Sequence, residues 1–396
     1  MPWSESRVDD RLKFIQEFSS GRWSVTELVR RHGVSRKTAY KFIDRFLEEG
    51  ATGLHDRSRA RHCQDHQTPS EIERRIVEAA REYGCWGPRK LVALLARRWP
   101  EIDWPAKSTA GDILKRHGLV TPRRKRRRTA SSSRSALAPA SEPNDLWCTD
   151  FKGWCLSGAR ERLEPFALGD GFSRYALACT LVDSTGDATV WPIFERSFRE
   201  YGLPRRIRSD NGPPFASPGI AGLSRLAVRW LRLGIRPERI VPGKPQQNGA
   251  LERFNLTLAL ETLSPPAPTR CRQQRVLQQF RERFNQVRPH EALGDRTPAE
   301  LYAPSPRRFP GRIPEFEYES HVVVRGVRRD GYVKWAGREF FLSETLAGER
   351  IGLQQISSRH WSVRLGPLQV ALLDEESHDI LRHQRLVWVD ETEQAS

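Results

Sequence analysis

Features that would place this chain of 396 residues in a membrane or outside the cell are missing from its sequence. It has no run of about 18 apolar residues, so we expect no membrane span. Its N-terminus has no charged-then-apolar signal pattern. The six cysteines form no Cys-x-x-Cys pair and no dense disulfide framework. These absences predict a protein of the reducing cytoplasm.

Well-spaced zinc ligands are also missing. His55, His62, Cys63 and His66 lie close together, but their spacing matches none of the usual zinc patterns and their surroundings are polar. We therefore expect no zinc site there.

Acidic residues are few relative to basic ones. Asp and Glu number 49 and Lys and Arg number 66, which gives a net charge of +17. An excess of this size favours a polyanionic partner, and nucleic acid is the obvious candidate. Most of the basic residues are Arg, which makes bidentate phosphate contacts. The codon usage of a GC-rich genome explains the same excess, and both readings stay open.

Residues 1–60 predict a helix-turn-helix DNA-binding domain. Apolar residues recur at helical spacing on both sides of Gly33, which supplies the turn, and Ser35 is a suitable N-cap for the following helix. The outer face of that helix is basic and able to hydrogen-bond, as a recognition helix requires. Its candidate DNA contacts are Arg36, Lys37, Thr38, Tyr40 and Lys41. The alternative is a three-helix bundle with a solvated charged face.

Residues 69–120 predict a second helix-turn-helix domain, in which Gly87-Pro88 opens one helix and Ser108 caps the next. We expect Trp86 and Trp99 to be core residues.

Residues 121–143 then predict a flexible basic linker, because a cationic run followed by Ser, Ala and Pro cannot bury a core. The alternative is a solvated tether without DNA contacts. The expected phosphate contacts of this arm are Arg123, Arg124, Lys125, Arg126, Arg127 and Arg128.

The rest of the chain predicts an α/β domain followed by a β domain. Over 144–305 the order of strands and helices is βββαβαβα, which indicates a mixed five-stranded sheet. Short alternating strands over 315–375 predict a small SH3-like β-barrel, and 376–396 is expected to be a tail. The fold class is therefore multidomain, with all-α helix-turn-helix units, an α/β core and a small β-barrel.

Three acids occupy unusual positions in the α/β segment. Asp150 interrupts an apolar strand, Asp210 ends a short strand before an Asn-Gly turn, and Glu252 lies in the first turn of a helix. Acids that converge from separate elements suit hard divalent cations, which take oxygen ligands. Two such ions activate water or a 3′-hydroxyl and stabilise the leaving oxygen of a phosphodiester.

The segment from Trp147 to Tyr302 resembles the catalytic core of the DDE transposases and retroviral-type integrases, and is most similar to the bacterial insertion-sequence transposases. The motifs that carry the resemblance are Thr-Asp150-Phe, Ser-Asp210-Asn-Gly, Pro-Gln-Gln-Asn-Gly-x-x-Glu252-Arg-Phe and Phe-Asn285-x-x-Arg288-Pro289-His290, followed by Thr297-Pro298. No motif decides alone, but together, in this order, they are specific.

The resemblance implies an RNase H-like fold in which Asp150, Asp210 and Glu252 hold two Mg²⁺ or Mn²⁺ ions. It implies binding of terminal inverted repeats through residues 1–120, nicking of the element ends by water, and attack of the freed 3′-hydroxyl on target DNA. It also implies a synaptic dimer or tetramer in a bacterial, nucleoid-associated setting. Lys244, Asn248 and Arg253, near the acid-bearing helix, are expected to grip the DNA backbone.

The chain departs from the family pattern in a few places. The spacing from Asp210 to Glu252 is longer than the tightest family spacing, which would place the acid at Gln246. Phe284 replaces the signature Tyr, and the zinc-binding helical domain of retroviral integrases is absent. Two other acids compete for a role. We interpret Asp170 as a turn cap, and Glu261 as too far along the helix to share the metal of Glu252.

Two further function classes were weighed. A catalytically inactive, transposase-derived DNA-binding regulator is the alternative, and the presence of all three acids argues against it. A metal nuclease that acts on RNA–DNA hybrids is disfavoured because helix-turn-helix units read the wide major groove of B-form DNA. The major groove of an A-form helix is too deep and narrow for side chains to read.

Overall fold

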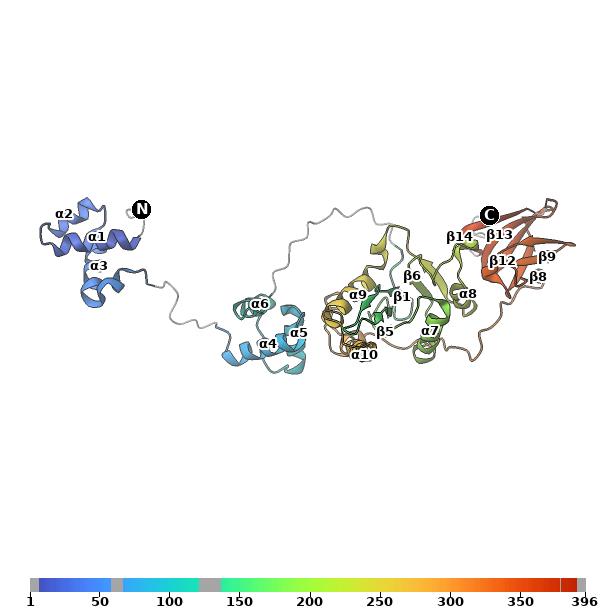
Figure 1. The fold of residues 1–396 in the computed structure, drawn as a ribbon, viewed down its shortest axis with the longest axis horizontal. Coiled ribbons are helices and arrows are strands. Elements are labelled where there is room, and N and C mark those ends of the chain that lie inside the picture. Colours follow the sequence, from blue (N-terminus) through green and yellow to red (C-terminus); the bar gives the residue numbers. More distant parts are fainter. Residues whose placement is uncertain (1–6, 58–66, 121–136, 378, 390–396) are drawn as a thin grey trace. The chain divides into compact units, whose positions relative to one another are not determined.

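The computed structural model describes residues 7–57, 67–120, 137–377 and 379–389 (Figure 1). The chain divides into two compact units, Met1–Thr68 and Pro69–Ser396. Three residues of the weighed zinc cluster, at 62, 63 and 66, lie outside the described residues, and so does the whole basic run at 123–128. None of the helices in the described ranges is long and apolar enough to cross a membrane.

The first unit contains the three predicted helices. They are α1 (Arg7–Ser19), α2 (Val25–Arg31) and α3 (Arg36–Glu49), followed by the 3-10 turn η1 (Gly50–Leu54). Ser35 caps α3 by accepting a hydrogen bond from the N–H of Thr38, and Gly33 has a positive φ of 62° between α2 and α3. The core of this unit includes Phe14, Leu28 and Phe42.

A second set of helices opens the other unit: α4 (Ser70–Tyr83), α5 (Pro88–Arg98) and α6 (Lys107–Arg116). Trp86 is buried and Trp99 packs against the same cluster, so both are core residues, as expected. The expected cap of α6 is wrong. The N-cap lies two residues earlier, at Ala106, which makes no side-chain cap, so Ser108 lies inside the first turn.

The α/β region has the predicted mixed five-stranded sheet, in the order β5-β4-β1-β6-β7. Strand β1 pairs antiparallel with β4 and parallel with β6, and β6 pairs parallel with β7. The strands are β1 (Leu146–Phe151), β4 (Pro165–Asp170), β5 (Ala176–Leu181), β6 (Arg206–Ser209) and β7 (Arg236–Arg239), with a small ladder of β2 (Cys155–Leu156) and β3 (Arg162–Leu163). The last strand was expected at Arg239–Val241 and begins three residues earlier.

Helices cover both faces of this sheet. They are α7 (Asp187–Tyr201), α8 (Arg225–Arg232), α9 (Gly249–Thr262) and α10 (Arg270–Gln286). Trp147 and Phe166 of the sheet pack with α7 and α8, whereas Leu146 and Cys148 pack with α9 and α10. A single helix was expected over 220–233. It is broken into η2 (Ile220–Gly222) and α8, because Ala221 has a positive φ of 51° and Ser224 caps a new helix.

The C-terminal region is a β domain. Its strands are β8 (Val323–Gly326), β9 (Tyr332–Trp335), β10 (Arg338–Phe341), β11 (Arg350–Gln355), β12 (His360–Leu365), β13 (Leu368–Asp374) and β14 (Ile380–Trp388). Five of them form the antiparallel sheet β14-β13-β12-β11-β8, and β9 and β10 form a separate ladder. Closure into an SH3-like barrel stays a prediction.

The prediction of a tail over 376–396 is wrong for Ile380–Trp388, which forms β14 and pairs with β13. Backbone hydrogen bonds of an edge strand do not need the alternating pattern that the sequence reading relied on. Leu381 of β14 is exposed, and the strand carries Arg382 and Arg385, so its side chains do not show the usual period of two.

Candidate active site

Sheet topology brings the first two acids to one edge. Asp150 lies near the carboxyl end of β1, and Asp210 directly follows β6. The two strands are parallel neighbours, with Leu146, Trp147 and Cys148 in register with Arg206, Ile207 and Arg208. Because the carboxyl ends of adjacent parallel strands meet at the same edge of a sheet, both carboxylates face that edge, where ligands commonly bind in such folds.

The turn after β6 fixes the orientation of Asp210. The N–H of Gly212 donates to Asp210 Oδ1 at 3.2 Å, and Asn211 Nδ2 donates to the carbonyl oxygen of Ile240 at 2.7 Å, which ties the turn to the end of β7. A Cβ atom at residue 212 would lie 3.2 Å from Asp210 Oδ2. Glycine is therefore the residue that leaves the carboxylate room.

Helix α9 supplies the third acid and a residue that sequence reasoning missed. Glu252 lies in the first turn and is exposed. Three residues further on, the buried Asn255 donates from Nδ2 to Asp150 Oδ2 at 3.0 Å. Residues i and i+3 share a helix face, so the helix that carries Glu252 also holds the Asp150 carboxylate. That spacing was the available signal for Asn255.

An arginine of β6 holds the segment before α9 in place. The buried Arg208 of β6 donates from Nη1 to the carbonyl oxygen of Gln247 at 3.0 Å and from Nε to Glu238 Oε1 at 2.7 Å. Gln247 belongs to η3 (Pro245–Asn248), which leads directly into α9. The strand that ends at Asp210 thus also holds the start of the helix that carries Glu252.

The negative charges of the acids affect one another's pKa values. Burial, and then the charge of Asp210, raise the pKa of the Asp150 carboxyl to about 6, and the charge of Glu252 acts in the same direction. Burial also raises the pKa of Asp210, against the N–H of Gly212, which lowers it. Mutual repulsion among carboxylates is the condition that a bound cation relieves.

The donor set fits hard divalent cations although it is not a closed cage. Across the described parts of the chain, no group of three His, Cys, Asp or Glu side chains is arranged to hold a metal ion. The charges of Asp210 and of Glu252 both raise the pKa of the Asp150 carboxyl. Mg²⁺ normally keeps several waters and binds one or two carboxylates together with substrate phosphates, so a preformed cage is not required.

Two competing acids serve the fold. Asp170 Oδ1 accepts from the N–H of Asn144 at 2.8 Å, and Oδ2 accepts from the N–H and the hydroxyl of Ser173, both at 2.7 Å. Its interpretation as a turn cap is confirmed. Glu261 is bound by Arg283 and Arg288.

The candidate DNA contacts differ in how far they reach the surface. On α3, Arg36, Lys37, Tyr40 and Lys41 are exposed, whereas Thr38 is half-buried and its hydroxyl lies 2.9 Å from that of Ser35. Near the acids, Asn248 is only 5% exposed and its Oδ1 has no hydrogen-bond partner among the described residues, so its contact with DNA stays a prediction. Lys244 is half-buried and Arg253 is exposed.

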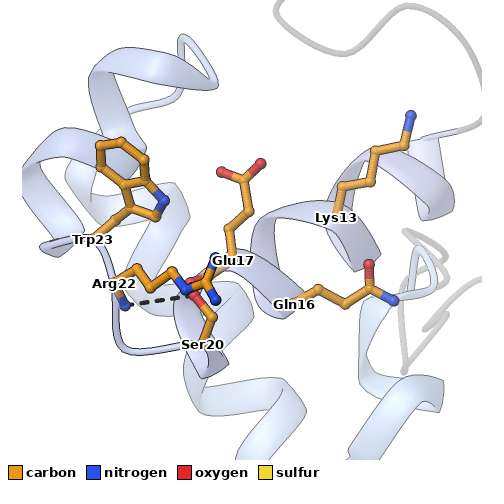
Figure 2. A pocket seen from close by; sticks show the side chains of 6 residues that line it. All are labelled: Lys13, Gln16, Glu17, Ser20, Arg22 and Trp23. Carbon is orange, nitrogen blue, oxygen red and sulfur yellow. Dashed lines mark hydrogen bonds between the residues drawn. The ribbon is translucent and has the colours of Figure 1, made fainter.

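A hollow of about 300 Å³ on the first unit is unrelated to the acids. Figure 2 shows that it is lined by α1 and the turn that follows it, with Lys13, Gln16 and Glu17 from the helix. Ser20, Arg22 and Trp23 complete the lining, and the Ser20 hydroxyl accepts from the N–H of Arg22 at 3.5 Å. It brings together no set of groups for phosphoryl chemistry.

Family models match most of these regions. Two models described as "Integrase core domain" match residues 140–245 and 233–298, and a "Helix-turn-helix domain" model matches residues 10–62. A "Homeodomain-like domain" model matches residues 38–114, which span parts of both helical segments. The resemblance of the sequence to an integrase core with helix-turn-helix segments before it is confirmed.

Curated relatives identify the family. "Transposase InsD for insertion element IS2-9" of Escherichia coli is 26% identical over 75% of this chain and 94% of its own length. The "Insertion element IS407 uncharacterized 31.7 kDa protein" of Burkholderia multivorans is 30% identical over 60% of this chain and 83% of its own length. This chain belongs to the insertion-element transposases.

Other matches of this insertion-element transposase are more limited. The "Insertion element IS476 uncharacterized 39.2 kDa protein" of Xanthomonas euvesicatoria is 30% identical over 59% of this chain, which spans 64% of that relative's length. A solved structure of the HTLV-2 integrase catalytic core domain in complex with magnesium is 16% identical, covers 41% of this chain and 99% of its own, and has a TM-score of 0.32. A score that low has no weight for the fold.

Proposed function

We propose that this chain binds the terminal inverted repeats of its insertion sequence and catalyses metal-dependent DNA cleavage and strand transfer. The observation that carries the proposal is the meeting of Asp150 and Asp210, at the carboxyl ends of two parallel strands, with the helix that bears Glu252. Asn255 on that helix donates to Asp150, so the arrangement is held by a direct hydrogen bond.

Each residue has a separate task. Asp150, Asp210 and Glu252 hold two Mg²⁺ or Mn²⁺ ions through oxygen ligands. The ions would lower the pKa of the attacking hydroxyl and neutralise charge at the leaving oxygen. Asn255 orients Asp150. The exposed Arg253 and the half-buried Lys244 contact backbone phosphates.

The reaction needs no nucleophilic side chain from the protein. In the first step a water oxygen bonds to phosphorus at the element end, and the 3′-oxygen leaves as a hydroxyl. In the second step this 3′-hydroxyl attacks a target phosphodiester, whose own 3′-oxygen leaves. Such phosphoryl transfers depend mainly on positioning and charge neutralisation, and the three acids around one sheet edge suit that demand.

The proposal includes the fold of each domain, the assembly of the protein and its DNA partners. The core is RNase H-like, the C-terminal strands close into an SH3-like barrel, and two or four copies assemble to hold two element ends together. Element-end and target DNA are the partners, in the bacterial cytoplasm and associated with the nucleoid. Arg36, Lys37, Tyr40 and Lys41 of α3, which are exposed, read base pairs in the major groove.

One assay tests the proposal. Purified full-length protein is mixed with labelled element ends, a target plasmid and Mg²⁺, and the products are scored for nicked ends and for ends joined to the target. We expect both products with element ends and neither with a scrambled duplex. Specific binding of element ends without any cleavage would contradict the proposal and would instead support a catalytically inactive DNA-binding regulator.

A further inference from the structure

The α4–α6 segment is packed on the catalytic region. Trp86, only 4% exposed, donates from Nε1 to Glu261 Oε1 at 3.1 Å. The Arg288 guanidinium lies 5.3 Å above the Trp86 ring and also pairs with Glu261. Val287, just after α10, packs against the α4–α6 core. A buried tryptophan thus joins the helical segment to α9 and to the residues after α10.

Charge complementarity extends this contact along α5. Arg89 donates from Nε to Asp295 Oδ1 at 2.9 Å and from Nη1 to Glu291 Oε1 at 2.6 Å. Arg97, two turns further along α5, pairs with Glu300. The basic residues of one helix therefore meet acids of the segment after α10, and Arg89 and Asp295 are each about two-thirds buried at the side chain.

Glu261 connects this contact to the active-site helix. Its side chain is 5% exposed and accepts from Arg283 of α10 at 2.8 Å in addition to Trp86 and Arg288. It lies near the end of α9, the helix that carries Glu252 in its first turn and holds Asp150 through Asn255. A carboxylate with three charged or polar donors in a buried place is costly to disturb.

The contacts of the motif Phe-Asn285-x-x-Arg288-Pro289-His290 give it a structural role. Asn285 Oδ1 accepts from the N–H of Ala176 at 2.8 Å and Asn285 Nδ2 donates to the carbonyl oxygen of Ala176 at 3.0 Å, which fixes the end of α10 to β5. Arg288 then reaches Glu261 and Trp86, and the His290 ring packs edge-on against Phe284, with 4.7 Å between centroids. These residues build the surface on which α5 lies.

Docking leaves one face of α6 available. Ala110, Ile113 and Leu114 point into the helical core, whereas Lys107, Lys115 and one acid, Asp112, are exposed. In a helix-turn-helix the second helix enters the major groove, so an exposed face on which lysines outnumber acids suits duplex DNA. Because α5 is fixed to the core, the position of α6 relative to the acids of the same unit is fixed as well.

We propose that this docking sets the number of base pairs between the DNA that α6 contacts and the phosphodiester bond that is cut. Glu261 is a positioning residue, since it acts through Trp86 and Arg288 and not on substrate. The inference deepens the proposed function and rests on it. The α1–α3 helices belong to the other compact unit.

The first variant breaks the contact by charge. Arg89→Glu places an acid against Asp295 and Glu291. A rescue variant adds Glu291→Arg and Asp295→Asn to it; Asn is chosen because residue 295 has a positive φ of 63°, which Asn tolerates. Arg74→Glu is the matched control, because Arg74 makes the same change of charge on α4 but pairs with Glu71 of its own helix. Trp86→Phe is a second break that keeps a ring and removes the N–H donor.

Two measurements are made on full-length protein. Hydrogen–deuterium exchange reports opening of the interface at residues 84–90 and 286–296 and does not depend on catalysis. Sequencing of nicked ends reports the cut position. For Arg89→Glu and Trp86→Phe we expect faster exchange in both segments and cuts spread over several phosphodiesters, where the parent cuts at one. The rescue variant and Arg74→Glu should cut at the parental position.

The outcomes separate the two claims. Faster exchange with an unchanged single cut position would overturn the positioning role of the docking while the proposed function stands. Unchanged exchange in both broken variants would show that these contacts do not hold the segment, and would also overturn the inference. A parent protein that cuts no element end would overturn the proposed function itself, and the inference with it.

Discussion

At the scale of residues, the environment of Asp150 disfavours its charged form. Its pKa of about 6 lies above the ordinary value of 3.8, because the carboxylate is buried beside Asp210. Between about pH 4 and pH 6 the folded protein therefore binds more protons at this site than the unfolded chain. Folding stability from this group consequently falls as pH rises through that window.

Replacing Asp150 should therefore stabilise the metal-free protein. We expect Asp150→Asn to raise the free energy of unfolding by about 1–3 kcal/mol at pH 8 in a chelator, and to change it little at pH 4, where the native acid is protonated. Calorimetric melting of the full chain at both pH values measures this, with the exposed Glu282→Gln as control. A lower melting temperature for Asp150→Asn at pH 8 would contradict the assigned repulsion.

Asn255 provides the second test at this scale. Loss of a side chain that orients a metal ligand typically lowers metal affinity or activity 10–100-fold. We expect Asn255→Ala to shift the Mg²⁺ dependence of cleavage to higher concentration by a factor in that range, with DNA affinity unchanged. Thr257→Ala on the same helix is the control, since its hydroxyl bonds only to the backbone of Arg253 among its described hydrogen bonds. A metal dependence identical to that of the parent would remove Asn255 from the site.

The three acids could be identified from the sequence, but the buried state of the two asparagines near them could not. The acids stood out because charge interrupts apolar strands and turn signals follow it. Asn255 did not, and Asn248 was expected to contact DNA, since both are polar residues in one motif and sequence spacing does not reveal how deeply a side chain is buried. The structure buries both, and of the two Asn255 donates to Asp150.

At the scale of elements, prediction worked where a local signal was complete. The residues of α10 and β6 were predicted as they are found, and Ser35 caps α3 as expected. The helix expected over 220–233 is broken at Ala221 because apolar periodicity continues through a kink that backbone conformation alone reveals. Strand β14 was missed because it is an edge strand whose pairing with β13 is a tertiary property.

The exposed face of α3 gives the prediction for this scale. Arg36→Ala and Lys37→Ala should each weaken binding to element ends by about 1–3 kcal/mol if the residue contacts a base. Fluorescence anisotropy with element-end and scrambled duplexes measures the difference, and the scrambled duplex serves as control. Equal weakening on both duplexes would mean that these residues contact phosphates and do not read sequence.

At the scale of the whole molecule, the net charge of +17 and the basic run at 123–128 dominate the expected DNA affinity. Each phosphate that is neutralised adds roughly 0.9 to the slope of log affinity against log salt. If four to six of these side chains contact the duplex, replacing the run with Ser should flatten the slope by about 4–5 units. Sequence preference should barely change. A slope equal to that of the parent would mean that the run is only a tether.

The arrangement of domains was only partly readable from sequence. Composition indicated where helical, α/β and β regions follow one another. The attachment of α4–α6 to the core, however, depends on Trp86, Glu261 and Arg288. Trp86 and Glu261 are 175 residues apart along the chain. Single-sequence patterns report local periodicity and do not reveal such long-range pairs.

The central claim is that three acids act together on DNA phosphodiesters. It is tested most directly by measuring Mg²⁺-dependent nicking of labelled element ends, with DNA affinity in parallel, for Asp150→Asn, Asp210→Asn and Glu252→Gln against Glu282→Gln and Asp170→Asn. The account predicts that each of the first three variants abolishes nicking and still binds element ends, that Glu282→Gln nicks like the parent, and that Asp170→Asn retains measurable nicking. Near-parental nicking by any of the first three would contradict the assignment of that acid.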